Sequence, residues 1–333
     1  MFSQLSQRAR ILWIGVPSFL VLLCLVGMFY LNHEPPPFNP DARATLHAQA
    51  HGHQVVPGYT ATATLIEVVD VLLDKRGGYL SNDILPPWVL LDNVPNWEFG
   101  VLTQVRDLAR AMRNDFSRSQ TQSTEDLDLA EADPLFHYDS ERWIPPDTEG
   151  RYRKGMDALE AYLTRLSSPS EPAAQFFARA DNLTDWLAIV EKRLGSLSQR
   201  LSASVGQARL NTDLSGDAEA RQSTESPGLV EVKTPWTQID DVFYEARGTA
   251  WALTHFLHAM ETDFEDVLRK KNALVSFRQI IRELESTQEP LHSPMVLNGS
   301  QFGLFANHSL IMANYISRAN AAIIDLRKLL QEG

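Results

Sequence analysis

The chain has 333 residues with 30 basic and 42 acidic side chains, which gives a formal net charge of −12. An acidic chain repels phosphate, so this composition excludes a nucleic-acid-binding protein that works by charge neutralisation. The only cysteine, Cys24, lies in an apolar N-terminal segment, which excludes disulfides and thiolate zinc sites from the rest of the chain.

Residues 11–31 form the first element, an uncharged apolar segment that reads ILWIGVPSFLVLLCLVGMFYL. A helix of this length spans about 30 Å, which matches the hydrocarbon core of a bilayer. The alternatives are a cleaved signal peptide and a buried core helix. The apolar core is longer than that of a signal peptide, and Met28-Phe29-Tyr30 is bulky where cleavage needs small residues. We therefore expect a single transmembrane anchor at 11–31.

The orientation of this anchor follows from its flanking charges. Arg8 and Arg10 precede the segment, and basic residues stay on the cytoplasmic side. Residues 1–10 are therefore expected to form a cytoplasmic tail, with the main domain on the other side. The absence of cysteine from that domain agrees with export. We expect a bacterial inner-membrane protein with a periplasmic domain; the alternative is a eukaryotic signal-anchor protein that faces the secretory lumen.

Residues 32–58 are expected to form a linker that contains proline and histidine. Pro35-Pro36-Pro37 favours extended polyproline geometry, a stiff spacer. His47, His51 and His53 form an H-x3-H-x-H pattern, and imidazole suits zinc or copper. The segment holds no acidic residue between these histidines, so chance histidines in a polar tether are favoured over a metal site.

The remaining pattern predicts an all-α bundle of long helices with ordered Pro-rich loops, because apolar residues recur at helical spacing and strand signals are nearly absent. Residues 205–234 are rich in Ser, Thr, Gly, Asp and Glu and predict a disordered loop. This loop separates helical region one (59–204) from helical region two (235–333), and the two regions are expected to share one core. Helices are expected at 60–75, 98–117, 151–166, 171–204, 237–286 and 309–331.

One predicted helix carries a heptad seam. Its apolar residues alternate steps of four and three, which is typical of coiled-coil-like pairing with another helix. The seam residues are Leu183, Leu187, Val190, Leu194, Leu197 and Leu201.

An arginine face and an acidic run lie close together in the sequence. Arg106, Arg110 and Arg113 share one helix face at i, i+4 and i+7, and Arg118 follows. One interpretation is a face that grips a carboxylate or phosphate of an envelope component. The favoured interpretation is that these arginines pair with the neighbouring acidic residues and lock the loop onto the helix. That run comprises Glu125, Asp126, Asp128 and Glu131.

The apolar Pro-rich stretch 84–99 is a second candidate partner surface, with Trp88, Trp97 and Glu98. If the protein is instead an enzyme that acts on an envelope substrate, carboxylates of Glu98, Glu125 or Asp126 are the candidate acid and base, and one of them should have a perturbed pKa. Nucleophile, phosphate-loop and dinucleotide signatures are missing, so no cofactor and no catalytic residue is predicted.

His255 and His258 lie three residues apart on a predicted helix, with Glu261 three further on. A di-iron bundle needs glutamate three residues before the histidine, and that position is Ala252. A structural pair is therefore favoured over a metal site.

Two sequence blocks carry a resemblance to a known family. They are DNVPNWEFGVLTQVRDLARAMRNDFSRSQTQSTEDLDLA (Asp92–Ala130) and NGSQFGLFANHSLIMANYISRANAAIIDLR (Asn298–Arg327). With the N-terminal anchor, they resemble the uncharacterised membrane-anchored bacterial proteins grouped as domain of unknown function 2333 (DUF2333). The resemblance implies an inner-membrane protein of a double-membrane envelope and implies no activity.

The leading functional hypothesis is a non-enzymatic cell-envelope protein with an interaction or structural role. The membrane is the first expected partner, followed by an envelope protein or cell-wall component, or a second copy of the chain. The alternatives are the envelope-acting enzyme and a signal-sensing accessory subunit.

Overall fold

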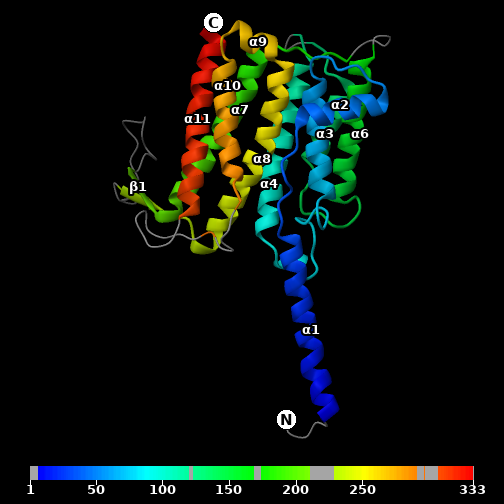
Figure 1. Ribbon diagram of the computed structural model, residues 1–333, viewed down its shortest axis with the longest axis vertical. Helices are drawn as coiled ribbons and strands as arrows, with labels where there is room; N and C mark the ends of the chain where they lie inside the picture. Colours follow the sequence, from blue (N-terminus) through cyan, green and yellow to red (C-terminus); the bar gives the residue numbers. More distant parts are fainter. Residues whose placement is uncertain are drawn as a thin grey trace, which may run out of the picture. The chain divides into compact units, whose positions relative to one another are not determined.

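The computed structural model describes residues 7–119, 123–168, 174–210, 229–290, 296 and 307–332. The chain divides into two compact units, Met1–Phe177 and Ala178–Gly333 (Figure 1). Both units are mostly helical, so the all-α fold class is confirmed. Within the described residues, no helix has the length and apolar character that a membrane crossing requires.

Unit 1 is built from six α-helices and two short helical turns in its described residues. The first two helices precede a helix that is buried along nearly its whole length, Tyr59–Asp74. The helices are α1 (Gln7–Leu31), α2 (Pro40–His51), α3 (Tyr59–Asp74), α4 (Asn93–Ala111), α5 (Leu127–Phe136) and α6 (Thr148–Ser167), and the turns are η2 (Trp88–Leu90) and η3 (Met112–Phe116).

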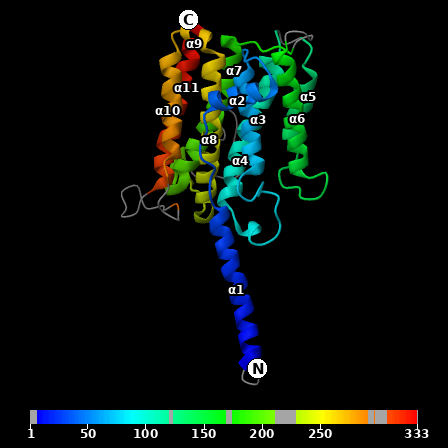
Figure 2. The ribbon, with the colours of Figure 1, turned by 45° about the vertical axis from the view of Figure 1, so that its right-hand side comes forward.

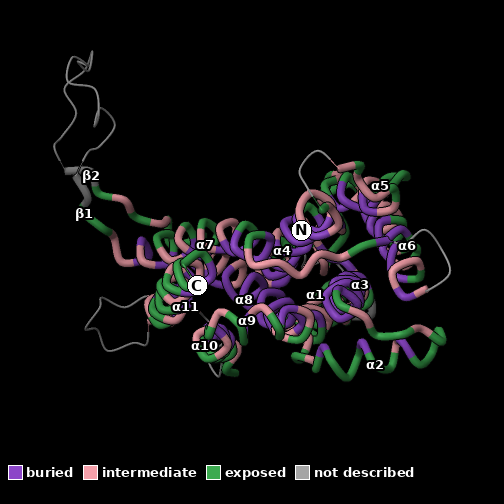
Figure 3. The backbone as a smooth tube through the Cα atoms, turned by 90° about the horizontal axis from the view of Figure 1, so that it is seen from above, coloured by how far each residue is buried: buried purple, intermediate pink, exposed green. Residues whose placement is uncertain are grey.

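Helix α3 is buried over most of its surface because apolar or small side chains cover all but the side that carries Glu67, Asp70 and Asp74. It contacts α2, α4 and α6, and Figure 3 shows it almost entirely buried. Three threonines on α3, Thr60, Thr62 and Thr64, are also buried. The Thr62 hydroxyl donates to the Gly58 carbonyl one turn back at 2.7 Å, whereas the buried Thr64 hydroxyl has no hydrogen-bond partner within the described residues.

Helix α2 occupies residues that the sequence predicts to be an extended linker, and this expectation is corrected. Asn39 caps the helix by accepting a bond from the Ala42 amide at 2.9 Å, and Pro40 fits the first helical position. Gly52 ends it in the left-handed conformation. Ala44 and Ala48 are buried against the unit, and this packing stabilises a helix too short to be stable alone.

Helix α1 meets the rest of unit 1 only near its C-terminal end among the contacts described. Leu31 packs in a small cluster with Leu80 and Val94. The Arg76 guanidinium lies 5.6 Å from the centre of the Tyr30 ring. From Trp13 to Tyr30 the large apolar side chains of α1 are predominantly exposed.

Unit 2 contains four longer α-helices, one short α-helix, three short 3₁₀ helices and a two-stranded sheet in its described residues. The elements are α7 (Ala180–Ser202), η4 (Ala203–Val205), β1 (Gln207–Leu210), β2 (Leu229–Val232), η5 (Trp236–Gln238), α8 (Ile239–Asp263), α9 (Glu265–Lys270), α10 (Leu274–Glu285), η6 (Ser286–Gln288) and α11 (His308–Glu332).

The heptad seam forms the contact between α7 and α11, which run side by side in Figures 1 and 2. All six seam residues are buried. From α11, Ile316, Ile323 and Leu330 are buried as well. The coiled-coil-like pairing expected from the period is therefore present, and its partner is the C-terminal helix.

The single kinked helix expected at 237–286 is instead a helical hairpin. Helix α8 ends at Asp263, α9 forms the corner, and α10 packs back against α8. Asn272 adopts a positive φ of 51°, a conformation that asparagine tolerates better than most residues. Folding back allows the apolar side of α10, with Phe277, Ile280 and Leu284, to become buried.

The segment predicted to be a disordered loop, 205–234, begins and ends in the small sheet. Strands β1 and β2 are antiparallel, with Gln207 opposite Val232 and Leu210 opposite Leu229. Residues 211–228 lie outside the described part of the chain, so the disorder prediction remains a prediction.

Candidate functional site

The arginine face of α4 is directed at α5 and its following loop. Arg106 donates from Nε to the Phe136 carbonyl at 2.7 Å and from Nη2 to the Tyr138 carbonyl at 2.9 Å. Phe136 is the last residue of α5, where helix carbonyls have no partner within the helix, and Tyr138 lies two residues beyond it. Arg106 therefore acts as a C-terminal cap, and its guanidinium bonds within the unit.

Arg113 makes the ion pair that the second interpretation of the arginine face predicts. Its guanidinium donates to Glu125 from Nε at 2.9 Å and from Nη2 at 2.7 Å. Its Nη1 also donates to Asp133 at 3.1 Å. The two carboxylates lie before and within α5, so Arg113 fastens both to η3, the turn that follows α4.

Asp126 and Asp128 take a different cation, Arg165 of α6. Arg165 donates to Asp126 at 2.7 Å and to Asp128 at 2.8 Å. The Asp126 carboxylate also accepts the Asp128 amide at 3.1 Å and so caps the N-terminus of α5. The acidic run thus connects α5 to both neighbouring helices.

The two other arginines of the predicted face have different surroundings. Arg110 is exposed, and its Nη2 lies 2.8 Å from His137 Nε2. Arg118 is partly buried and follows η3. The four arginines therefore do not form one open cationic patch, because Arg106 and Arg113 bind groups of their own unit.

Glu98, in α4, is fully buried. Its carboxylate bonds to the start of the segment that precedes α4, residues 79–92, which we call loop 79–92. Its carboxylate forms an ion pair with Lys75. It also accepts the amides of Leu80 and Ser81, each at 2.8 Å, and the Ser81 hydroxyl. Four donors thus satisfy the buried charge, which is the condition under which a carboxylate tolerates burial. Nearby Asp83 has a raised pKa because of burial and the negative charge of Glu98, partly offset by Lys75.

These contacts bear on the acid–base hypothesis for Glu98, Glu125 and Asp126. Each carboxylate is held by a cation of the same unit, namely Lys75, Arg113 and Arg165. A general acid or base must instead be free to reach the proton of a substrate within hydrogen-bond distance. The contacts therefore count against any two of these three carboxylates acting together as a catalytic acid and base.

The tryptophans of the predicted partner loop have separate positions. Trp97 is completely buried in α4 and belongs to the core of unit 1. Trp88, in η2, packs partly buried against the cluster of Leu31, Leu80 and Val94. Of these two tryptophans, only Trp88 lies in loop 79–92.

The three histidines of the predicted linker meet in a cluster, which we call the histidine cluster (His47, His51, His53, Tyr59 and Glu160). His47 and His51 stack with ring centres 4.3 Å apart. The Tyr59 hydroxyl lies 2.9 Å from His47 Nδ1 and 3.1 Å from His53 Nδ1. His47 Nε2 lies 3.0 Å from the Glu160 carboxylate. Helix α2 brings these groups to α3 and α6.

The donor and acceptor roles in this cluster follow from counting hydrogens. The Glu160 carboxylate only accepts, so His47 Nε2 carries its hydrogen and, in the neutral ring, Nδ1 accepts from the Tyr59 hydroxyl. The single hydroxyl hydrogen is then used, so His53 Nδ1 donates to Tyr59. The result is a directed chain of hydrogen bonds from His53 through Tyr59 and His47 to Glu160.

Two pKa values in the histidine cluster are shifted. Burial and the neighbouring Glu160 charge raise the pKa of Tyr59 to about 12. Burial and the nearby rings of His51 and His47 lower the pKa of His53. Among the described residues, no group of three or more His, Cys, Asp or Glu side chains is arranged to hold a metal ion. The contacts therefore define a hydrogen-bond chain that runs from His53 through Tyr59 and His47 to the Glu160 carboxylate.

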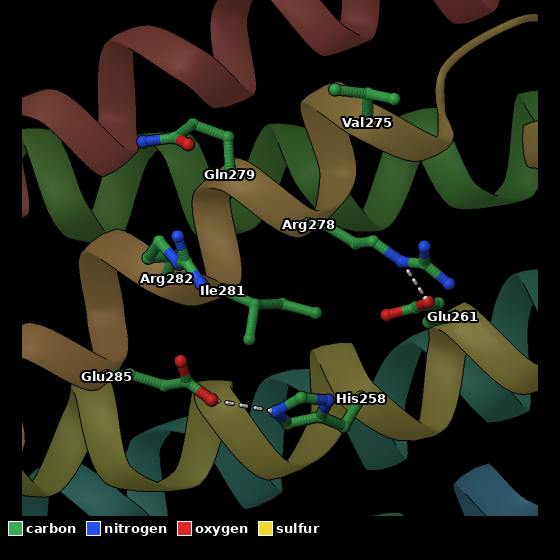
Figure 4. Close-up of a pocket in the computed structure, with 8 residues that line it drawn as sticks. All are labelled: His258, Glu261, Val275, Arg278, Gln279, Ile281, Arg282 and Glu285. Carbon is green, nitrogen blue, oxygen red and sulfur yellow. Dashed lines mark hydrogen bonds and ion pairs between the residues drawn. The ribbon is translucent and has the colours of Figure 1, made fainter.

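In unit 2, His255 and His258 lie in different surroundings on α8. His255 is buried, and its Nδ1 donates to the Trp251 carbonyl at 2.6 Å. Burial lowers the pKa of His255 to about 4, with that bond and the neighbouring His258 as smaller influences. His258 faces a groove of about 370 Å³ between α8 and α10 (Figure 4).

The groove is crossed by two side-chain contacts that join its walls, and one of them is an ion pair. His258 Nε2 lies 3.2 Å from Glu285, and Arg278 Nε donates to Glu261 at 2.6 Å, as drawn in Figure 4. Because Glu261 pairs with Arg278, Glu261 does not join His255 and His258 in a set of metal ligands. These contacts fasten α10 to α8.

Comparison with known proteins identifies the family. A family model described as "Uncharacterized protein conserved in bacteria (DUF2333)" matches residues 6–333, nearly the whole chain. The chain belongs to the DUF2333 family. No curated protein and no solved structure matches it. Membership confirms the resemblance drawn from the two sequence blocks, and the family description names no activity.

Several polar residues of this DUF2333 chain have roles that the sequence analysis did not assign. Lys75, Tyr59 and Glu160 belong to contacts that cross between helices, and Arg165 bonds to residues 37 and 39 positions away. Periodicity within one helix carries no signal for such pairs. The one available signal was Asn39-Pro40, which is a helix start and would have moved the histidines from a tether to a helix.

Proposed function

We propose that this protein is anchored in a bacterial inner membrane by residues 11–31, with the rest of the chain outside the cytoplasm, and that it works through interactions in the cell envelope. The observation that carries the proposal is the exposure of consecutive apolar residues on α1. Phe19, Leu20, Val21, Leu22 and Leu23 are all at least half exposed.

Five consecutive residues cover more than one full turn of a helix, since a turn takes about 3.6 residues. A helix on the surface of a soluble domain has an apolar stripe and a polar face. Helix α1 has no polar face over this stretch, and in water its apolar surface would be unfavourable on every side. A bilayer removes that cost. The proposal also draws on Ile11, Leu12 and Ile14 of the printed sequence, whose side chains the structure does not describe.

The orientation in the proposal rests on charge. Arg8 and Arg10 precede the apolar segment, and Glu34 follows it. Basic residues beside an anchor remain in the cytoplasm. The periplasmic placement also fits a domain without cysteine, because free thiols are a liability in an oxidising compartment.

The interaction role is supported by the state of the polar groups in unit 1. The carboxylates that an enzyme would use, Glu98, Glu125 and Asp126, are bound to cations of their own unit. The groups are positioned to hold helices and loops together. An envelope protein or a cell-wall component is the proposed partner, and self-association is the alternative that the same experiments address.

A cysteine-accessibility experiment tests anchoring and orientation. In full-length protein with Cys24→Ser, Val275→Cys places a thiol at a site that is 80% exposed. Cells with a permeabilised outer membrane are treated with a membrane-impermeant maleimide, and membranes are then washed with alkaline carbonate. We expect labelling of this variant and retention in the membrane. The matched control, Ser3→Cys in the cytoplasmic tail, should be labelled only after lysis.

Release of the protein by carbonate would overturn the anchor, and labelling of the tail but not of position 275 in intact cells would overturn the orientation. In-cell crosslinking followed by mass spectrometry tests the interaction role. Reproducible capture of one envelope component supports it. Capture of the chain alone supports self-association instead.

A further inference from the structure

Two loops of unit 1 expose apolar side chains although they belong to a well-packed unit. Residues 84–91 of loop 79–92 read ILPPWVLL, without a charge or hydrogen-bonding side chain except the Trp88 indole. Ile84, Leu85, Val89 and Leu90 are each at least half exposed. In the second loop, residues 138–147, Trp143 and Ile144 are also about half exposed.

The first loop lies against the C-terminal end of α1, as Figure 2 shows. A Cβ atom added to Gly27 would come within 3.1 Å of the Pro87 side chain. Gly27 is four residues before Leu31, which corresponds to about 6 Å along the helix axis. Trp88 and Leu91 pack on the cluster that contains Leu31. The loop therefore runs beside the last turn of the apolar segment.

The second loop is fastened to the first. Asn82 donates from Nδ2 to the Arg142 carbonyl at 3.3 Å. The Tyr138 hydroxyl donates to the Pro146 carbonyl at 3.0 Å, and the Thr148 hydroxyl lies 2.7 Å from the Asp139 carbonyl. These bonds hold the backbone of the second loop, so its two exposed apolar residues are presented by a fixed segment.

We propose that these two loops, the apolar loop pair (residues 79–92 and 138–147), insert into the interfacial layer of the phospholipid bilayer beside the anchor. The proposal rests on the proposed function, since it takes α1 as a membrane helix. If α1 spans the bilayer to Leu31, the contact at Gly27 puts Pro87 at or below the level of the headgroups. Tryptophan is favoured at this depth because its ring is apolar and its indole N–H remains hydrated.

The exposed apolar side chains of the apolar loop pair have a lower free energy in contact with lipid than in contact with water. Exposed leucine, isoleucine and valine gain free energy on transfer to the acyl boundary. The charged residues Asp83 and Asp92 bracket the apolar run and leave its centre uncharged. Loop insertion would hold unit 1 close to the bilayer, whereas an anchor followed by a free tether would allow it to stand off.

The test uses the full chain with Cys24→Ser in vesicles of phosphatidylcholine and phosphatidylglycerol. Single cysteines are introduced by Leu85→Cys and Ile144→Cys and labelled with an environment-sensitive fluorophore. The two positions are exposed, so the substitutions leave packing intact. Leu22→Cys reports on the anchor, and Val275→Cys is the matched exposed control in unit 2. Fluorescence is compared in vesicles with and without brominated acyl chains.

We expect loss of fluorescence from bromine at positions 22, 85 and 144, and none at 275. Quenching at position 22, together with unchanged fluorescence at positions 85, 144 and 275, would overturn the loop insertion. The membrane anchor would remain supported by that result. Absence of quenching at 22 would overturn the anchor; quenching at 85 and 144 in that case would still support membrane contact by the loops. A blue shift at 85 without bromine quenching would identify a protein contact and overturn the lipid proposal.

Discussion

Lys75 and Glu98 form an ion pair within unit 1 whose two side chains are almost completely buried, at 2% and 0% exposure. Lys75 also donates to the carbonyls of Leu72 and Gly78. The pair thus joins the end of α3 to α4 at the point where loop 79–92 begins. The base of the apolar loop pair is therefore fixed by polar contacts, while its tip exposes apolar side chains.

Replacing Lys75 with methionine should destabilise the protein strongly. The substitution leaves the buried Glu98 carboxylate without its cation, and breaking one side of such a pair costs about 3–5 kcal/mol. Arg153→Met is the matched control, because Arg153 pairs with Asp74 at the surface and such pairs contribute at most about 1 kcal/mol. Urea unfolding of the full chain in detergent, followed by circular dichroism, measures both. Equal losses in the two variants would show that the buried pair contributes no more than a surface pair.

Arg106→Ala and Arg110→Ala should separate the structural arginine from the exposed one. Arg106 donates to two carbonyls at the end of α5, and hydrogen bonds of charged donors contribute roughly 1.5–3 kcal/mol. Arg110 is exposed and bonds only to His137 among the contacts described, so its loss should cost less than about 1 kcal/mol. Thermal unfolding of the two variants provides the comparison. A larger loss for Arg110 would contradict the capping role of Arg106.

The periodic parts of the fold were predictable because periodicity is a property of one segment. The seam from Leu183 to Leu201 identified both the helix and its buried side, and the expected last helix, 309–331, agrees with α11 within one residue at each end. The resemblance carried by the two sequence blocks was confirmed as family membership. The partner of the seam was not predictable, because a heptad pattern does not specify which helix it meets.

The remaining features depended on contacts distant in sequence. Helix α2 has weak amphipathic character, and its stability comes from the burial of Ala44 and Ala48 in unit 1. The turn at Asn272 has neither glycine nor proline at its corner, so the sequence favoured a continuous helix. The pairing of Asp126 with Arg165 crosses 39 residues, whereas sequence proximity favoured the arginines of α4.

Leu194→Ala should weaken unit 2 through loss of seam packing. Leu194 is fully buried in α7, and truncation of a buried leucine costs about 2–5 kcal/mol. Leu329→Ala on α11 is the control, because this side chain is 41% exposed and its loss should cost well under about 2 kcal/mol. Chemical denaturation, monitored by circular dichroism, gives both free energies of unfolding. A small loss at Leu194 would mean that α7 and α11 do not depend on the seam.

Tyr59→Phe tests the hydrogen-bond chain of the histidine cluster. The change removes the hydroxyl that bonds His47 and His53, and loss of such a partner costs about 1–3 kcal/mol when the groups are shielded from water. We also expect altered ring-proton titration of His53 by nuclear magnetic resonance. For the free energy of unfolding, His51→Gln is the control, because His51 bonds the His47 carbonyl and not the hydroxyl. Unchanged titration in Tyr59→Phe would contradict the directed chain.

His255 should make the stability of unit 2 depend on pH between 6.5 and about 4. Its folded-state pKa of about 4 lies below the unfolded value of 6.5, so the unfolded state binds the proton more readily in this interval. The stability is therefore fully present above pH 6.5 and falls as the pH drops toward 4. A difference of this size corresponds to about 3 kcal/mol.

The measurement is the free energy of unfolding of the full chain at several pH values, followed by circular dichroism and by tryptophan fluorescence. Trp251, whose ring lies 4.3 Å from that of His255, contributes to the fluorescence signal. In His255→Gln, which keeps an N–H donor for the Trp251 carbonyl, the additional loss toward pH 4 should disappear. His258→Gln should retain it, since His258 lies in the groove and pairs with Glu285. Identical pH profiles for the native chain and His255→Gln would mean that His255 titrates as it does in the unfolded chain, and that burial on α8 does not control it.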